Sequence, residues 1–182
     1  MKKGFTLIEL LIVISVISIL SGVIFSSLSG SLKHAKYSKA KVEIKQLMGM
    51  VRAARINTGR TFGQITGNFC TECGCRDKGN IQLLPKTDSC WTQYQNSFDL
   101  LKQAAGNASG LSVFSDPWGA PYLFNENEGE ACCCIDMVNW CCTDNILSAG
   151  PDGLYYNSDD IVANIETECR PEAGSHHPNS NW

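Results

Sequence analysis

Ten cysteines are the residues of this chain best suited to chemistry, and none of them occurs before residue 70. In an exported chain, an even number of cysteines predicts disulfides that staple a small domain, although their pairing is not readable. The stretch C-T-E-C-G-C offers an alternative, a zinc or iron–sulfur site with thiolates from Cys70, Cys73, Cys75 and Cys90. We favour disulfides, because exported thiols tend to be oxidised before they meet a metal. The candidate disulfide cysteines are Cys70, Cys73, Cys75, Cys90, Cys132, Cys133, Cys134, Cys141, Cys142 and Cys169.

A second group of candidate residues is acidic and lies in P-D-G-L-Y-Y-N-S-D-D-I, which contains Asp152, Asp159 and Asp160. Calcium takes about six to eight oxygen ligands from carboxylates and carbonyls. The three aspartates converge only if the loop folds back on itself, and without a cation their mutual repulsion opposes that fold. Spacing alone leaves a second interpretation open, in which Asp152 and Gly153 form a turn and the other two aspartates are a solvated pair.

Catalytic motifs are absent from the sequence. It contains no G-x-S-x-G, no P-loop and no C-x-x-C-H, and His34, His176 and His177 have no catalytic neighbours. Fifteen basic and 18 acidic residues give a net charge of −3, so no broad basic surface for nucleic acid is indicated. We therefore predict that the chain is not an enzyme and does not bind nucleic acid.

The elements that position these groups begin with an apolar run from Phe5 to Phe25, in which Glu9 is the one ionisable residue. A helix of that length rises roughly 30 Å, about the thickness of the hydrocarbon core of a bilayer. Two lysines precede the run, so the positive-inside rule places the N-terminus in the cytoplasm and the chain from Ser26 onward outside. A carboxyl group in lipid is costly and usually has a partner. The alternative interpretation is that Glu9 snorkels to the headgroups.

A cut after Gly4 would give Glu9 such a partner, because Phe5 would then carry a new α-amino group one helical turn from the carboxylate. Pairing between chains would set the axial register of stacked helices. The string G-F-T-L-I-E resembles the class III signal of type IV prepilins and type II secretion pseudopilins. The resemblance implies cleavage and N-methylation at Gly4 and Phe5, and filament assembly through Glu9. An ordinary secretory signal cleaved near residues 26–31 and an uncleaved single-pass anchor are the alternatives.

The apolar period continues beyond this run. Ile44, Leu47, Met48 and Val51 recur at i, i+3, i+4 and i+7, which is one face of an amphipathic helix, and basic residues occupy mostly the other positions. Gly59 follows the last periodic residues and suits a helix stop. We predict one long helix from about Phe5 to Thr58, half in lipid and half packed on an exported domain.

The middle of the chain shows weaker patterns. Residues 61–91 have little periodicity and predict a cysteine-rich loop. Residues 96–105 predict a short packing helix, capped by Asn96 or Ser97 and ended by Gly106.

The last third predicts an antiparallel sheet. Asp116, Pro117 and Gly119 fit a type I turn that leads into the first strand. Three short strands are predicted at about residues 121–125, 131–140 and 145–150. The order of long helix, loop, short helix and sheet is an α+β fold.

The C-terminal half carries a second resemblance. The stretch D-P-W-G-x-P-Y, a strand pair, S-A-G-P-D-G and a trailing D-D-I resemble the major pseudopilin of type II secretion systems. This resemblance implies a pilin-like fold, in which a long N-terminal (transmembrane plus amphipathic) helix packs on a small antiparallel β-sheet, here with a cysteine-rich loop insertion. It also implies a calcium-binding loop. Carried over by position, the ligands would be the carboxylates of Asp152, Asp159 and Asp160 and the carbonyls of Ala149, Leu154 and Asn157.

These expectations divide the chain into six segments. They are a leader peptide (1–4), a transmembrane helix and filament-core segment (5–28), the periplasmic half of the long helix (29–60), a cysteine-rich loop with a short helix (61–114), an antiparallel sheet with a calcium-type loop (115–169) and a polar tail (170–182). The chain departs from the pseudopilin family in its cysteines and in running on past the D-D-I stretch.

We expect the chain to be a pseudopilin-like structural subunit of a type IV filament for type II secretion, single-pass in the inner membrane with an exported, periplasmic domain. The implied partners are further copies in a helical filament, a prepilin peptidase, an inner-membrane assembly platform, minor pseudopilins and, before assembly, the membrane. A major or minor pilin of an extracellular pilus is one alternative, which the cysteines and the longer chain would suit. A membrane-anchored, cysteine-rich metal-binding or binding module is another.

Overall fold

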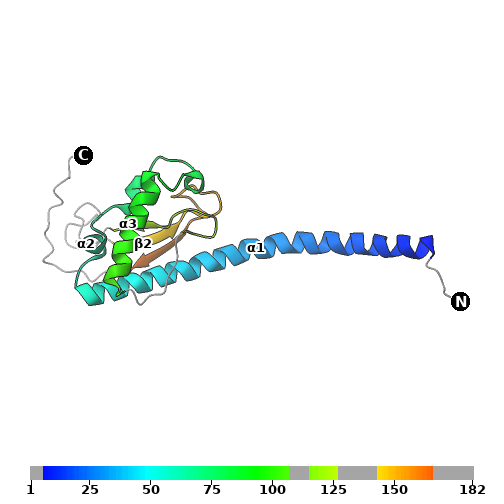
Figure 1. Cartoon of the computed structure of the whole chain (residues 1–182), viewed down its shortest axis with the longest axis horizontal. Coiled ribbons are helices and arrows are strands. Elements are labelled where there is room, and N and C mark those ends of the chain that lie inside the picture. The colour runs from blue at the N-terminus through cyan, green and yellow to red at the C-terminus, as the bar shows by residue number, and fades with distance from the viewer. Residues whose placement is uncertain (1–5, 107–114, 127–142, 166–182) are drawn as a thin grey trace. The chain divides into compact units, whose positions relative to one another are not determined.

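The computed structural model describes residues 6–106, 115–126 and 143–165, and for residues 23–29 it describes the backbone alone. The chain forms two compact units, residues 1–38 and residues 39–182. The elements run in the order α1 (Leu7–Thr58), α2 (Phe62–Thr66), η1 (Thr71–Cys75), η2 (Ile81–Leu83), α3 (Ser89–Ala104), β1 (Leu123–Asn125), β2 (Asp144–Ser148) and β3 (Ile161–Ile165), where η marks a 3₁₀ helix (Figure 1). The α+β class predicted from the sequence is confirmed.

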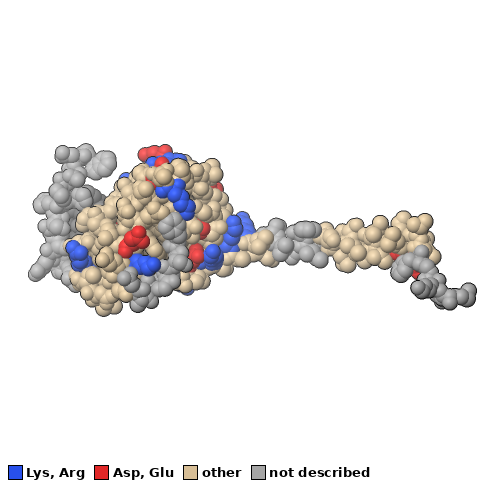
Figure 2. Space-filling model, viewed as in Figure 1, with Lys and Arg blue, Asp and Glu red and all other residues tan. Residues whose placement is uncertain are grey.

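In the first unit, α1 exposes apolar side chains all around its axis. Leu7 is 88% exposed and Ile19 70%, and Figure 2 shows this stretch almost entirely in the colour of uncharged residues. A helix that is apolar on every side is normally buried in something else. Within the described part of the chain, no helix has both the length and the apolarity needed to cross a bilayer. The transmembrane segment predicted at residues 5–28 includes residues outside that part and is not confirmed.

In the second unit, α1 packs on the sheet through one face. The predicted residues Ile44, Leu47 and Val51 are buried and Met48 is half-buried, which confirms the amphipathic pattern. Further buried residues of this stretch are Ala40, Met50 and Ala54. A hydrogen bond from the Tyr122 hydroxyl to Glu43 Oε2 (2.5 Å) joins the same stretch of helix to the residue just before β1. The helix ends as predicted, because Gly59 adopts φ 65° and its N–H donates to the Arg55 carbonyl at 2.8 Å.

The sheet has three strands in the order β1-β2-β3, and both neighbouring pairs are antiparallel. Leu147 on β2 lies opposite Leu123 on β1 and Val162 on β3. Strands β1 and β2 confirm the predictions near 121–125 and 145–150, whereas the strand predicted at 131–140 lies outside the described residues. Strand β3 was not predicted, because its five residues directly follow a polar loop and read as the end of that loop.

Helix α3 begins earlier than the short helix predicted at residues 96–105. Its N-cap is Asp88, whose Oδ1 accepts from the N–H of Cys90 at 2.8 Å, so Asn96 and Ser97 lie inside the helix and the predicted caps are wrong. The cap was hidden in a segment that reads as loop. The predicted end is right, since Gly106 has φ 88° and directly follows Ala105, the C-cap of α3. The buried face of α3 is formed by Cys90, Trp91, Tyr94, Ser97, Phe98 and Leu101.

Residues 61–91 form short helices rather than the predicted loop. Helix α2 starts with a capping box, in which Gln64 N donates to Thr61 Oγ1 (3.4 Å) and Thr61 N donates to Gln64 Oε1 (3.1 Å). The 3₁₀ helices η1 and η2 follow. Segments of three to five residues are too short to produce a recognisable hydrophobic period, which explains why the sequence pattern missed them.

Candidate functional site

The first candidate site is the N-terminal end of α1, where Glu9 and Thr6 form a reciprocal cap. Thr6 donates to Glu9 Oε2 from its backbone N–H and from its hydroxyl, both at 2.8 Å. The N–H of Glu9 donates back to Thr6 Oγ1 at 3.3 Å. This is the capping-box arrangement, which satisfies donors that the first helical turn leaves free.

The cap fixes the direction in which the carboxylate points. Both Thr6 donors use Oε2, and among the described residues no donor contacts Oε1 of Glu9. Within the described residues, Oε2 of this acid is engaged by Thr6 and Oε1 is not. Gly4 and Phe5, the predicted cleavage and methylation residues, lie outside the described residues, so the predicted pairing of Glu9 with the Phe5 amine stays a prediction.

The second candidate site is the loop between β2 and β3, which holds every predicted calcium ligand. Gly150 and Gly153 adopt φ 64° and 71°, a left-handed conformation that lets the chain turn back. Asn157 closes the loop, because its Nδ2 donates to Asp152 Oδ2 at 2.9 Å and to the Leu154 carbonyl at 3.0 Å. Two of the predicted ligand oxygens, Asp152 Oδ2 and the Leu154 carbonyl oxygen, therefore converge on the Asn157 amide nitrogen.

Asp160 is the most constrained carboxylate of this loop. Its Oδ2 accepts from the N–H groups of Tyr156 (2.6 Å) and Asn157 (3.2 Å), and its Oδ1 is buried without a hydrogen-bond partner in the described structure. Burial raises the pKa of Asp160, the two backbone donors oppose that rise, and the charges of Asp159 and Asp152 add to it. The charges of Asp159 and Asp152 thus act unfavourably on the ionised carboxylate of Asp160.

The donor set of the loop fits a hard cation in part. In the described ranges, no three His, Cys, Asp or Glu side chains are grouped so as to hold a metal ion. Bound calcium would therefore need carbonyl oxygens as well as carboxylates, which is its usual preference. In this loop Asp160 Oδ1 is buried without a hydrogen-bond partner among the described residues, whereas Asp152 Oδ2 and the Leu154 carbonyl already accept from Asn157 Nδ2. Of the remaining predicted ligands, Ala149 is buried where the loop begins and Asp159 packs against Gly150.

Four cysteines are paired in two disulfides, Cys70–Cys73 and Cys75–Cys90. The disulfide prediction is confirmed for these four. The alternative zinc or iron–sulfur site at the same residues is wrong, because a disulfide sulfur is not a thiolate ligand. The predicted disulfide cysteines Cys132, Cys133, Cys134, Cys141, Cys142 and Cys169 lie outside the described residues.

A buried acid, Glu126, is a feature that sequence reasoning missed. Its Oε1 accepts from the Thr71 hydroxyl at 2.5 Å and its Oε2 from the Thr71 N–H at 2.8 Å, while Thr71 Oγ1 lies 2.7 Å from Ser97 Oγ. Burial raises the pKa of Glu126 to about 8 against the lowering effect of these bonds. Glu126 lies in N-E-N-E-G-E, which reads as a polar turn, so no local signal marks it.

A second buried acid, Asp144 on β2, forms an ion pair with Arg55 near the end of α1. Arg55 Nη2 lies 2.6 Å from Asp144 Oδ2, and the Asp144 side chain has no exposed surface. A buried carboxylate is tolerated when a charged donor pairs with it. This pair therefore ties α1 to the middle strand of the sheet.

Comparison with known protein families finds a match for one segment of the chain. Residues 1–25 match the family model described as the prokaryotic N-terminal methylation motif, the signal found in type IV pilins and pseudopilins. The match contains Gly4, Phe5 and Glu9 and supports a type IV pilin-like structural subunit that a prepilin peptidase processes. No curated protein and no solved structure matches the chain.

Proposed function

We propose that the chain is a pseudopilin-like subunit of a type IV filament, which polymerises from the inner membrane through α1 to form a pseudopilus for type II protein secretion. The observation that carries the proposal is the methylation motif at residues 1–25, combined with a single, oriented acid at Glu9. Before assembly, residues 5–28 lie in the membrane and the following domain is exported.

The surface of α1 suits a move from lipid into a bundle of like helices. The hydroxyls of Ser15, Ser18 and Ser21 donate to the carbonyls of Leu11, Ile14 and Ile17 at 2.7–2.8 Å. These hydroxyls therefore carry no unmet donor into apolar surroundings, where an unsatisfied polar group is costly. The exposed apolar side chains of residues 7–20 gain burial in either environment.

Glu9 sets the register of the bundle. In the mature chain Phe5 carries a positive α-amino group, and Oε1 of Glu9 is the oxygen left for the amine of a neighbouring copy. The Thr6 cap holds the carboxylate in place before that neighbour arrives, so little side-chain freedom is lost on pairing.

Two measurements test this assembly. Mass spectrometry of the mature protein should show a chain that starts at Phe5 with an N-methyl group. The Glu9→Leu variant should be cleaved normally but form few or no filaments in electron micrographs, because the buried amine loses its partner. Ser18→Ala is the matched control and should assemble as the unaltered chain does. Normal filaments from Glu9→Leu would refute the proposed pairing.

We also propose that the loop at residues 149–160 binds calcium. Calcium should raise the melting temperature of the full chain in detergent, and a chelator should reverse the rise. Asp159→Ala should abolish the effect, whereas Asp99→Ala, which removes an exposed acid on α3, should preserve it. An unchanged melting temperature with calcium and with chelator would discard the calcium site but not the filament.

An extracellular pilus is the second candidate, and the disulfides suit it as they suit a periplasmic pseudopilus, because both compartments are oxidising. Cross-links at Cys70–Cys73 and Cys75–Cys90 suit a filament that meets an oxidising exterior. Shearing intact cells and probing the released material for the chain decides between the two. Sheared filaments indicate a surface pilus, whereas chain found only with the cell envelope indicates a pseudopilus.

A further inference from the structure

One short segment, Asn80–Gln82, holds three carbonyls of the acidic loop. Gln82 Nε2 donates to the Gly150 carbonyl at 2.8 Å, and Asn80 Nδ2 donates to the Asp152 carbonyl at 2.7 Å. The backbone N–H of Ile81 donates to the Gly153 carbonyl at 2.9 Å. Three donors from consecutive residues thus fix three carbonyls within four residues of the loop. We call Asn80–Gln82 the clasp.

The loop is shaped to admit the clasp. Gly153 adopts φ 71°, and a Cβ at this position would collide with the Asn80 side chain and lie 2.9 Å from Gln82 Cγ. Only a residue without a side chain permits both this backbone conformation and this approach. The fit between clasp and loop therefore involves backbone as well as side chains.

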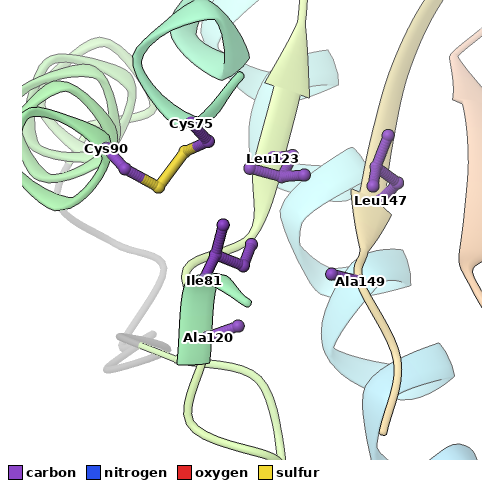
Figure 3. Close-up of a cluster of buried hydrophobic side chains, with 7 residues drawn as sticks. All are labelled: Cys75, Ile81, Cys90, Ala120, Leu123, Leu147 and Ala149. Atoms are coloured by element: carbon purple, nitrogen blue, oxygen red, sulfur yellow. A yellow bond between two sulfur atoms is a disulfide. The ribbon is translucent and has the colours of Figure 1, made fainter. Parts of the chain in front are cut away.

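A capping hydrogen bond and a buried cluster hold the clasp itself in place. Asn80 Oδ1 accepts from the N–H of Gln82 at 2.9 Å and so caps η2. Ile81 has no exposed surface and belongs to a buried cluster that contains the Cys75–Cys90 disulfide and Ala149 at the start of the loop. Figure 3 shows Ile81, the disulfide and Ala149 within this cluster. The disulfide thus anchors the short segment before the clasp to α3.

A second contact joins the loop to the same cysteine-rich region. The Tyr156 hydroxyl donates to Glu72 Oε1 at 2.8 Å, and Arg76 Nη2 lies 3.3 Å from the same oxygen. Glu72 lies on η1, between the two cysteines of the Cys70–Cys73 disulfide. The loop is therefore held at its beginning by the clasp and further along by η1.

We propose that the cysteine-rich region orients the loop that binds the cation. Asn80, Ile81 and Gln82 are its positioning residues. The clasp engages the carbonyls of Gly150, Asp152 and Gly153, so these three are not available as ligands. A cation would take Asp160 Oδ1 and would displace the Asn157 amide from Asp152 Oδ2 and the Leu154 carbonyl. Because the loop is ordered before the ion binds, less conformational entropy is lost on binding. This role rests on the calcium binding proposed above, but the ordering of the loop does not.

The test removes the clasp's side-chain donors and keeps its cap. In Asn80→Ser the hydroxyl can still cap η2 but cannot reach the Asp152 carbonyl, and Gln82→Met replaces the amide at similar length without adding charge. The control, Asn57→Ser, removes a bond of the same kind from Asn57 Nδ2 to the Ala104 carbonyl (3.2 Å). All variants are made in the full chain in detergent, and calcium affinity is measured by titration calorimetry.

For the double variant Asn80→Ser/Gln82→Met we expect the calcium dissociation constant to rise roughly tenfold, because two net hydrogen bonds are lost. Hydrogen exchange without calcium should also speed up at residues 153–160. Asn57→Ser should leave both quantities within about twofold of the unaltered chain. Unchanged exchange in the double variant, or equal loosening of the loop by Asn57→Ser, would overturn the proposal. If the unaltered chain binds no calcium, the proposed calcium site and the role of the clasp in it are refuted. The exchange measurement then still decides whether the clasp orders the loop.

Discussion

Replacement of Glu126 by glutamine should remove a pH dependence of stability that the wild-type chain owes to this one carboxyl group. Burial raises the pKa of Glu126 from 4.5 to about 8 in the folded protein. The unfolded chain therefore releases this proton at lower pH than the folded chain does. Below pH 4.5 both states hold the proton, so the group contributes its full stability there and loses it as the pH rises to about 8.

The size of the effect follows from the shift. A difference of about 3.5 pKa units, at roughly 1.36 kcal/mol for each unit, corresponds to about 5 kcal/mol lost between pH 4.5 and pH 8. Glutamine has nearly the same shape, carries no charge, keeps an oxygen for the Thr71 N–H and presents an amide NH2 that can donate to Thr71 Oγ1. At pH 8 the Glu126→Gln chain should therefore be more stable than the wild type by several kcal/mol, whereas near pH 4.5 the two should differ by about 1 kcal/mol or less.

Urea unfolding of the full chain in detergent, followed by tryptophan fluorescence between pH 4.5 and pH 9, measures this effect. Other groups also titrate in that range, so the relevant quantity is the difference in unfolding free energy between wild type and Glu126→Gln at each pH. Asp99→Asn, which alters an exposed acid, should keep the wild-type pH dependence. A difference between wild type and Glu126→Gln that stays constant with pH would refute the reasoning.

Three further substitutions test contacts that stabilise the fold. Cys75→Ala/Cys90→Ala opens a cross-link with a sequence separation of 15 and should lower the unfolding free energy by about 3 kcal/mol in non-reducing urea titrations. Arg55→Met should cost about 3–5 kcal/mol in the same assay, because it removes the charged Arg55 partner of the buried Asp144 carboxylate, and Asp144→Asn in the same chain should recover most of the loss. Gly153→Ala should lower the melting temperature through backbone strain of about 1–2 kcal/mol, and an unchanged value would contradict the close approach at this residue.

The parts of the fold with strong local signals could be predicted from the sequence. The buried face and the end of α1 follow from a sustained apolar period and from Gly59. The turn before β1 follows from Asp116 and Gly119: the Gly119 N–H donates to the Asp116 carbonyl at 3.1 Å, and Gly119 has φ 100°. Each of these signals lies within a few residues of the structure that it specifies.

The parts that depend on distant residues could not be predicted. The cap of α3 at Asp88 lies in a segment without a readable period. The bonds from Asn80 and Gln82 to the acidic loop span 72 and 68 residues, so nothing near either residue signals them. The spacing of the aspartates indicated the loop itself, but its support comes from tertiary contacts that a single sequence does not reveal.

The attachment of α1 to the sheet has a mechanical consequence. Tyr122–Glu43 and Arg55–Asp144 lie about three helical turns apart along α1, with the buried face of the helix between them. A force along the helix axis would act on both contacts and on the buried face at the same time. The contacts would therefore resist the force together and would not break one after another. Residues 39–58 of α1 can therefore bear tension without separating from the sheet.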